Sequence, residues 1–274
     1  MNFKEVYNYV SSELHRVGIL EQSETDFLIC EALHVKRVQL KLIKTITNAE
    51  NDAILKILSE RITHKPLDKI IKNTNFYGYN FFVNEKVLSP RPETEILTEE
   101  VVKQILNCKQ KLKVLDLCTG SGCIATVIAL KTSAEVTAID IDAQALEIAK
   151  TNAKYLGANI EFIKSDLFEL INGYKFDIIV SNPPYIPSAQ IELLQPEVKD
   201  YDPKIALDGG IDGLEFYKKI ITEAKDYLNE HGKIYFEVGY NQAQTVKKLM
   251  EKEYTAKIIK DYSQIERIVY GIRR

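Results

Sequence analysis

The residues with the most distinctive chemistry are 181–185, with the sequence Ser-Asn-Pro-Pro-Tyr. They follow segment 176–180, which is apolar except for Asp177. A short apolar run of this kind predicts a buried strand, so these five residues would stand at its carboxyl end. Proline has no backbone N–H and favours an extended conformation in the residue before it. Asn182 and Pro183 would therefore present their oxygen atoms in nearly fixed directions, as a rigid pair of hydrogen-bond acceptors.

Two such acceptors suit a planar nitrogen that carries two hydrogens, as in an amide or an arylamine. Its lone pair is delocalised, and acceptance of both hydrogens by the Asn182 side chain and the Pro183 carbonyl would orient the nitrogen toward an electrophile. Proximity and alignment would supply most of the rate, with no separate general base. We predict catalytic roles for Asn182, Pro183 and Tyr185, and a substrate-binding site that also includes Pro184. The alternative is a turn that only ends the strand.

A glycine-rich loop follows a second apolar segment, residues 114–117, and precedes a helical pattern. A strand, a glycine-rich turn and a helix form the place where doubly wound sheets bind nucleotide-like cofactors. Gly120 and Gly122 let the backbone approach such a ligand. The pattern Gly120-x-Gly122-x-x-Ala125 also fits the dinucleotide fingerprint, so the loop alone leaves NAD open. The loop residues that we expect to bind the cofactor are Cys118, Thr119, Gly120, Ser121 and Gly122, and we expect Asn182 to contact the cofactor as well as the substrate.

Asp116, just before this loop, favours S-adenosyl-L-methionine over NAD. A buried carboxylate there would repel a pyrophosphate but attract the ammonium of a methionine moiety, directly or through water. Asp140 follows the next predicted strand and would accept hydrogen bonds from two ribose hydroxyls. Alternatively, Asp140 caps the helix that begins near Ala143.

Asp166 follows the third predicted strand, where its carboxylate would accept a hydrogen bond from an adenine amino group. Leu167 or Phe168 would cover the adenine ring, and Phe168 is the residue that we assign to the cofactor site. The alternative is a plain loop with a buried phenylalanine.

An α/β fold must position these groups, because strands and helices alternate from Lys113 onward in the rhythm of an open, doubly wound sheet. The expected strands are 114–117, 135–139, 160–163, 176–180, 233–238, 256–259 and 266–270. The expected helices lie near 143–155, 213–229 and 242–251, with another ending at Lys131.

The first 71 residues differ, since their apolar positions recur at helical spacing and predict a small bundle of four or five helices. The aromatic and β-branched segment 75–84 predicts a hairpin, and residues 89–95 a linker that ends in a helix start. We expect an N-terminal helical domain over 1–74, a β-hairpin linker over 75–90 and a catalytic domain over 91–274.

The composition is that of a globular protein with 274 residues, of which 45% are hydrophobic and 27% charged. No apolar run approaches the roughly 18 residues that a membrane span needs, and the N-terminus lacks a signal-peptide pattern, so we expect a cytoplasmic location. The four cysteines have no metal-ligand spacing and predict free thiols without a metal. A net charge of −3 weighs against tight general binding to nucleic acid.

Several segments together resemble the peptide-chain release factor glutamine methyltransferases, also called the HemK family. They are Phe76-x-Gly78-x-x-Phe81-x-Val83, residues 88–95, the loop 116–122 and residues 181–185, with 206–214 and Glu237-x-Gly239-x-x-Gln242 as further points of similarity. Nucleic-acid adenine methyltransferases share Asn-Pro-Pro-Tyr but lack the Arg-Pro-Glu-Thr-Glu segment found here. Cys118 stands where the family usually has Gly, and Ser89 where an apolar residue is commoner.

The resemblance implies a seven-stranded class I methyltransferase sheet with a small N-terminal helical bundle and a linking β-hairpin. It also implies methylation of the side-chain amide of the glutamine in the Gly-Gly-Gln loop of release factors, which act in translation termination. The N-terminal domain would help to dock this protein substrate, because residues 1–75 carry 11 basic and 10 acidic side chains. We expect a monomer that needs no direct contact with nucleic acid.

Four alternatives remain open at this point. An adenine N6 methyltransferase acting on DNA or RNA, or a ribosomal-protein glutamine methyltransferase, would have a similar nitrogen pocket. An NAD-dependent oxidoreductase would use Gly120 to Ala125 but would leave residues 182–185 without a role. A non-catalytic binding module would keep the fold alone.

Overall fold

The computed structural model describes all residues, 1–274, and contains two compact units. The helical unit comprises Met1–Lys72 together with Gln195–Tyr201, and the sheet unit comprises Asn73–Leu194 and Asp202–Arg274. The chain therefore returns to the helical unit for seven residues, 195–201, in the middle of the sheet unit.

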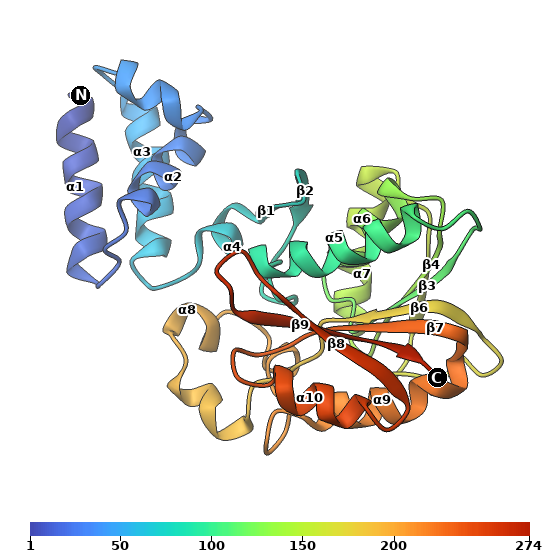
Figure 1. The fold of residues 1–274 in the computed structure, drawn as a ribbon. Helices are drawn as coiled ribbons and strands as arrows, with labels where there is room; N and C mark the ends of the chain where they lie inside the picture. Colours follow the sequence, from blue (N-terminus) through green and yellow to red (C-terminus); the bar gives the residue numbers. More distant parts are fainter. The chain divides into compact units, whose positions relative to one another are not determined.

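The helical unit is built from α1 (Phe3–Arg16), α2 (Gln22–Leu33), α3 (Asn48–Arg61) and the short α4 (Leu67–Ile71), with a 3₁₀ helix, η1, over Arg37–Leu42 (Figure 1). These elements confirm the four or five expected helices. Apolar side chains of α1, α2 and α3, such as Val10, Leu28 and Ile54, are fully buried and form its core. The spacing of these residues places them on the inner helix faces.

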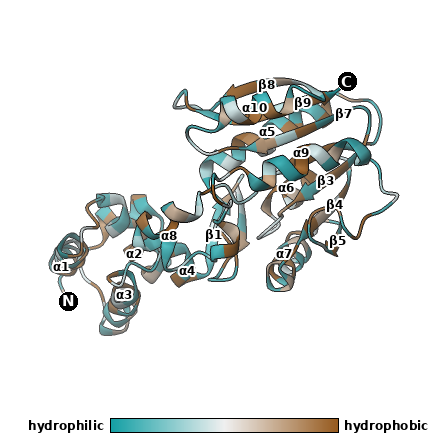
Figure 2. Ribbon diagram, turned by 90° about the horizontal axis from the view of Figure 1, so that it is seen from below, coloured by the Kyte–Doolittle hydropathy of each residue, from teal (hydrophilic) through white to brown (hydrophobic).

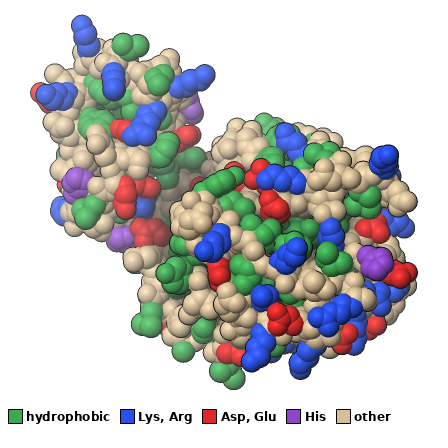
Figure 3. Space-filling view, in the orientation of Figure 1, with side chains coloured by type: hydrophobic (Ala, Val, Ile, Leu, Met, Phe, Trp, Pro, Cys, Tyr) green, Lys and Arg blue, Asp and Glu red, His purple; other side chains and the backbone are tan.

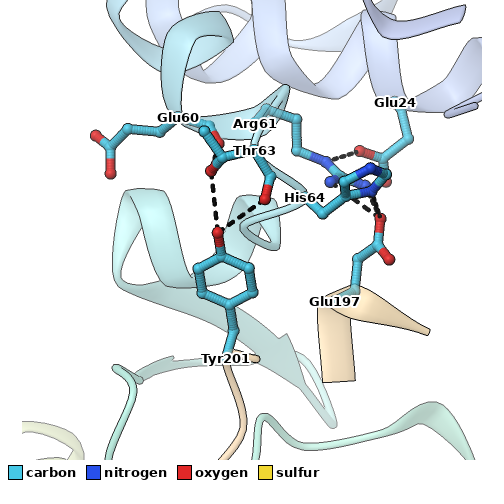
Figure 4. Close-up of polar contacts among 7 residues, drawn as sticks. All are labelled: Glu24, Glu60, Arg61, Thr63, His64, Glu197 and Tyr201. Atoms are coloured by element: carbon cyan, nitrogen blue, oxygen red, sulfur yellow. Dashed lines mark hydrogen bonds and ion pairs between the residues drawn. The ribbon is translucent and has the colours of Figure 1, made fainter. Parts of the chain in front are cut away.

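Residues 195–201 contain the short helix α8 (Pro196–Lys199), which contacts the end of α3. Arg61 is only 5% exposed and lies between two carboxylates, with Nε 2.9 Å from Glu24 and both terminal nitrogens 3.3 Å from Glu197 (Figure 4). His64 Nδ1 lies 3.1 Å from Glu197, and the Tyr201 hydroxyl donates to the Thr63 carbonyl at 2.8 Å. The sequence-based domain boundaries had placed this segment in the catalytic domain.

The sheet unit has a seven-stranded sheet in the order β5-β4-β3-β6-β7-β9-β8, as expected for a class I methyltransferase (Figure 1). All neighbouring pairs among the first five are parallel, and β9 is antiparallel to both β7 and β8. The strands are β3 (Lys113–Leu117), β4 (Glu135–Asp140), β5 (Ile160–Lys164), β6 (Phe176–Ser181), β7 (Leu228–Glu237), β8 (Tyr254–Lys260) and β9 (Glu266–Arg273).

Helices cover both faces of this sheet. On one face lie α5 (Pro92–Leu106), α6 (Cys123–Lys131) and α7 (Ala143–Leu156), and on the other lie α9 (Glu215–Tyr227) and α10 (Ala243–Met250). Two separate clusters of buried apolar side chains fill the layers between the sheet and these helices. Figure 2 shows the hydrophobic colour concentrated on the strands, whereas the helices carry both colours. Burial on both faces explains the continuous apolar runs of the parallel strands.

A two-stranded hairpin, β1 (Asn73–Phe76) and β2 (Tyr79–Phe82), belongs to the sheet unit. The hairpin was expected as part of a separate linker over residues 75–90, but it starts two residues earlier and is fixed to two helices. Glu95 of α5 accepts the Tyr77 N–H at 2.7 Å. Asn152 of α7 exchanges hydrogen bonds with both backbone groups of Phe82 and donates to the Ser121 carbonyl at 2.9 Å. The hairpin is thereby tied to the glycine-rich loop.

Candidate functional site

A cavity of about 190 Å³ opens at the carboxyl ends of the parallel strands. Such sheets bind ligands where neighbouring connections leave in opposite directions, and here that point lies between β3 and β6. The cavity brings together most of the residues that the sequence singled out: Cys118, Thr119, Gly120, Ser121, Asp140, Asp166, Asn182 and Pro184. Asp116, Gly122, Phe168, Pro183 and Tyr185 do not line it.

The pairing of β3 with β6 places the two predicted motifs side by side. Leu117 is in register with Ser181, and the Ser181 hydroxyl donates to the Leu117 carbonyl at 2.8 Å. Both residues are fully buried. The glycine-rich loop after β3 and the Asn-Pro-Pro-Tyr turn after β6 therefore start from fixed, adjacent points.

Asp116 lies beneath the glycine-rich loop, fully buried. Its Oδ2 accepts hydrogen bonds from the Thr119 hydroxyl at 2.6 Å and from the Ala125 N–H at 3.2 Å, whereas its Oδ1 has no partner in the protein. Burial raises the pKa of Asp116 to about 7, although both hydrogen bonds lower it. The carboxyl therefore braces the loop from below and retains one unused acceptor.

Asp140, at the end of β4, is partly exposed on the cavity wall. Its two oxygens accept the N–H of Gly120 at 2.8 Å and of Asp142 at 2.9 Å. Burial raises the pKa of Asp140, and these backbone hydrogen bonds oppose that rise. The cap of α7 is Asp142, whose side chain accepts the Gln144 N–H at 2.9 Å. The helix-cap alternative for Asp140 is therefore wrong, and its carboxylate lies on the cavity wall.

The two glycines of the loop serve different purposes. A Cβ on Gly120 would meet no atom within 4 Å, so this residue leaves open space beside the cavity. A Cβ on Gly122 would lie 2.8 Å from the Cβ of Ala149, so the absence of a side chain lets α6 approach α7. Both have positive φ, as does Cys118 at 61°, where a non-glycine residue is strained. Burial is the main cause of the raised pKa of the Cys118 thiol.

The segment after β5 places Asp166 and Leu167 on the cavity wall but turns Phe168 away from it. Phe168 is 1% exposed and stacks on Tyr227, with ring centroids 4.5 Å apart. Leu167 has φ of 46°, which reverses the chain between the two residues. Of the two side chains proposed to cover a ring, Leu167 is the one in position, and Phe168 belongs to the core.

The Asn-Pro-Pro-Tyr turn is held by residues 207–213, which run beside it. Ile186 exchanges backbone hydrogen bonds with Leu207 and Gly209, at 3.0 and 2.9 Å. A Cβ on Gly209 would lie 2.7 Å from the Cα of Tyr185. The buried side chain of Gln242 donates to the Tyr185 carbonyl at 2.9 Å. These contacts explain the first glycine of the segment Ala-Leu-Asp-Gly-Gly and the position of Gln242, for which the sequence suggested no role.

Asn182 joins a buried polar group that the sequence did not reveal. Its Nδ2 donates to the Thr94 hydroxyl at 3.3 Å, and that hydroxyl donates to Glu237 at 2.6 Å. Thr94 lies on α5 and also lines the cavity, and Glu237 ends β7. Both residues belong to segments that carry the family resemblance, but nothing in the sequence indicated their contact, because 143 residues separate Thr94 from Glu237.

Further residues complete the cavity wall. Arg91, whose role the sequence left open, lines the cavity and pairs with the buried carboxylate of Asp202 at 2.7 Å. Apolar cover comes from Ile205 and Phe216, and Lys219 adds a cation. No group of three or more His, Cys, Asp or Glu side chains could hold a metal ion, and no helix has the length and hydropathy of a membrane span.

The wall suits S-adenosylmethionine, since Gly120 leaves open space and Asp140 offers a carboxylate. Beneath the glycine-rich loop, Asp116 keeps an unpartnered oxygen. Residues 92–195 match the family model described as a methyltransferase small domain. A solved methyltransferase from Pyrococcus furiosus is 24% identical with a TM-score of 0.55, over 78% of this chain and 96% of that one. The T. thermophilus 16S rRNA N2 G1207 methyltransferase, solved with AdoMet and guanosine, is 17% identical with a TM-score of 0.53, over 74% of this chain and 50% of that one.

The fold and the cavity define a class I methyltransferase, and its cofactor is S-adenosylmethionine. A release factor glutamine methyltransferase from Geobacter sulfurreducens is 38% identical over 90% of this chain and 88% of its own. Another from Bacillus cereus is 35% identical over 99% of both chains. The chain belongs to the release factor glutamine methyltransferase family, which confirms the resemblance found in the sequence and sets the nicotinamide alternative aside.

Proposed function

We propose that this protein methylates the side-chain amide nitrogen of the glutamine in the Gly-Gly-Gln motif of peptide-chain release factors. The names of its relatives support this substrate. The observation that carries the proposal is the placement of Asn182, which lines the cavity beside the glycine-rich loop and uses Nδ2 for its hydrogen bond within the protein. Its Oδ1 is thereby left to accept a hydrogen from a substrate amide.

In this proposal the glycine-rich loop and three carboxylates hold the cofactor. Thr119, Gly120 and Ser121 approach it through their backbone, with Cys118 beside them. Asp140 accepts hydrogen bonds from the ribose hydroxyls, and Asp166 accepts from the adenine amino group next to Leu167. Asp116 attracts the methionine ammonium through its unpartnered Oδ1, across a water molecule because Asp116 does not line the cavity. Gly122 acts indirectly, by allowing α6 to pack against α7.

The bound cofactor supplies an electrophilic methyl group on a positively charged sulfur. The Asn182 Oδ1 and the Pro183 carbonyl accept the two hydrogens of the glutamine amide and orient its nitrogen. Pro184 lines the cavity and holds the turn in shape, while Tyr185 anchors it through the Gln242 contact. The amide proton becomes acidic only as the new bond forms, so alignment provides most of the rate.

The helical unit is the part that we assign to contact with the release factor. Its near balance of 11 basic and 10 acidic side chains over residues 1–75 favours a protein surface over a phosphate backbone. On the face of the molecule shown in Figure 3, Lys and Arg side chains are interspersed with Asp and Glu. We expect the enzyme to act as a monomer in the cytoplasm.

Transfer of a labelled methyl group tests the proposed substrate. The enzyme is incubated with labelled S-adenosylmethionine and, in separate reactions, a bacterial release factor, ribosomal protein, ribosomal RNA or duplex DNA. Label should enter the release factor and not its Gly-Gly-Gln→Gly-Gly-Ala variant. Label confined to nucleic acid, or to ribosomal protein, would contradict the proposal and support one of the other substrates.

A further inference from the structure

Glu237 is a buried acid with no role in the mechanism above. It is 3% exposed and ends β7 directly beside the Asn182 turn. Its side chain accepts the Thr94 hydroxyl at 2.6 Å, while Arg267 pairs with Asp261 at 3.4 Å. An acid buried without an ion pair lowers stability, so its presence requires another explanation.

The Thr94 hydroxyl connects Glu237 to Asn182 in one direction only. A hydroxyl has a single hydrogen, and Thr94 donates it to the Glu237 carboxylate at 2.6 Å. Toward Asn182 the Thr94 oxygen can therefore only accept, and it accepts from Nδ2 at 3.3 Å. When Glu237 is ionised, the Asn182 side chain is therefore stabilised with its donor, Nδ2, toward the interior.

The orientation of Asn182 matters because the two ends of its amide group have opposite hydrogen-bonding character. Rotation by 180° exchanges an acceptor for a donor at nearly the same position. With Oδ1 toward the cavity, Asn182 accepts an N–H of a substrate amide. With Nδ2 toward the cavity, two donors would face each other and the substrate nitrogen would lose its partner.

We propose that Glu237 and Thr94 are positioning residues that lock the Asn182 side chain with its oxygen toward the substrate amide. This inference rests on the proposed function, because it assigns an orientation to the residue that binds the substrate nitrogen. Glu237 acts on Asn182 mainly through Thr94, and a weaker direct hydrogen bond between the Asn182 amide and the Glu237 carboxylate favours the same orientation. The role explains why α5, β7 and the turn after β6 converge on one buried polar group.

The lock depends on the charge of Glu237. A protonated Glu237 can donate to the Thr94 oxygen, which frees the Thr94 hydrogen to point at Asn182 Oδ1 and favours the wrong orientation. Burial raises the pKa of Glu237 to about 7, so this exchange falls near neutral pH. The titratable and charged groups that face Glu237 from the surrounding elements are Glu93 of α5, Cys123 of α6, Tyr185 after β6, Tyr217 of α9 and Arg267 of β9.

The test compares Thr94→Val with Thr94→Ser, which keeps the hydroxyl, and with Thr98→Val. Thr98 is a matched control one turn along α5, since its buried hydroxyl donates to the Thr94 carbonyl instead. With release factor as substrate, kcat should fall about 10- to 100-fold in Thr94→Val and stay within about threefold in the other two. The cofactor Kd should change less than about threefold in all three, and thermal unfolding verifies that each variant is folded.

A double variant separates positioning from a merely structural role. In an Asn182→Ala background there is no amide to orient, so adding Thr94→Val should lower kcat no further. Wild-type kcat should fall as pH drops below about 7, and Glu237→Gln should lack this dependence. The inference is overturned if Thr94→Val retains full kcat, or if its loss multiplies with that of Asn182→Ala. Wild-type inactivity on the release factor would overturn the proposed function as well.

Discussion

Asp140 accepts the backbone N–H of Gly120 at 2.8 Å, which ties the end of β4 to the tip of the glycine-rich loop. A single carboxylate thereby shapes the loop and faces the cavity. The adjacent carboxylate, Asp142, takes over the capping of α7 and leaves Asp140 available. This division of tasks between two neighbouring acids underlies the first prediction.

Replacement of Asp140 by Ala should weaken binding of S-adenosylmethionine about 10- to 100-fold, because two ribose hydrogen bonds to a charged group disappear. The kcat at saturating cofactor should change much less. Isothermal titration calorimetry gives the affinity, and a melting curve of the cofactor-free protein checks the loop. An unchanged affinity would remove Asp140 from the ribose site.

Replacement of Asp116 by Asn should alter the dependence of stability on pH. Burial raises the pKa of Asp116 from 3.8 to about 7, so the folded state binds this proton more tightly than the unfolded state does. The stability that this group contributes is full below about pH 4 and is lost as pH rises through 7. At about pH 8 the cofactor-free Asp116→Asn protein should be more stable than wild type, by on the order of 1–2 kcal/mol.

Urea unfolding at about pH 5 and about pH 8 measures this difference. Glu237 also has a pKa raised to about 7 and should retain a slope of the same sign in the variant. Cofactor affinity should move in the opposite direction and fall, since the methionine ammonium loses its attracting charge. Parallel pH curves for the two proteins would show that Asp116 is not protonated on folding.

The two loop glycines should respond differently to Ala. Gly122→Ala places a Cβ 2.8 Å from that of Ala149, at φ of 77°, and should lower the free energy of unfolding by about 2–4 kcal/mol. Gly120→Ala meets no atom and should lower it by only about 1–2 kcal/mol, through its positive φ. Cofactor affinity should fall more in Gly120→Ala than in Gly122→Ala, because Gly120 lies on the cavity wall. Equal losses of stability would argue against separate roles.

Arg61→Ala should loosen residues 195–201 from the helical unit, because Glu24 and Glu197 would lose the cation between them. Partial burial raises the pKa of Glu197, but hydrogen bonds from its own backbone N–H, His64 and Arg61 outweigh this effect and lower the pKa, so its charge persists at neutral pH. Amide hydrogen exchange at 195–201 should become about tenfold faster or more, equivalent to about 1.4 kcal/mol. Arg37→Ala is the control, since Arg37 pairs with Asp26. Unchanged exchange in Arg61→Ala would refute this role.

The strands and their order along the chain could be predicted from the sequence, because parallel strands are buried on both faces. Residues such as Ile178, Ile179 and Val180 form apolar runs that helices rarely show, and the chemical motifs stand where those runs stop. The first part of β7 carries three consecutive polar residues, 229–231, and lies beside an irregularity in the pairing of β6 with β7. That part of the strand therefore had no recognisable pattern.

Contacts between segments that lie far apart in the chain could not be predicted from the sequence. Residues 195–201 form a single short helical turn whose side chains are mostly half-buried, so no periodicity marks them as part of another unit. Leu167, and not Phe168, lines the cavity, and Leu167 has a positive φ. The sequence does not signal this backbone conformation, because the residue is not a glycine. The Thr94 and Glu237 contact forms only when α5 and β7 pack together.

The central claim is that Asn182 holds a glutamine amide nitrogen beside the methyl group of the cofactor. Tandem mass spectrometry of a bacterial release factor, after incubation with the enzyme and S-adenosylmethionine, tests it most directly. Wild type should add one methyl group to the side-chain nitrogen of the Gly-Gly-Gln glutamine. Asn182→Ala should do so at least about 100-fold more slowly, with cofactor affinity largely retained. An unmodified glutamine after wild-type treatment, or methylation by Asn182→Ala at the full rate, would contradict the claim.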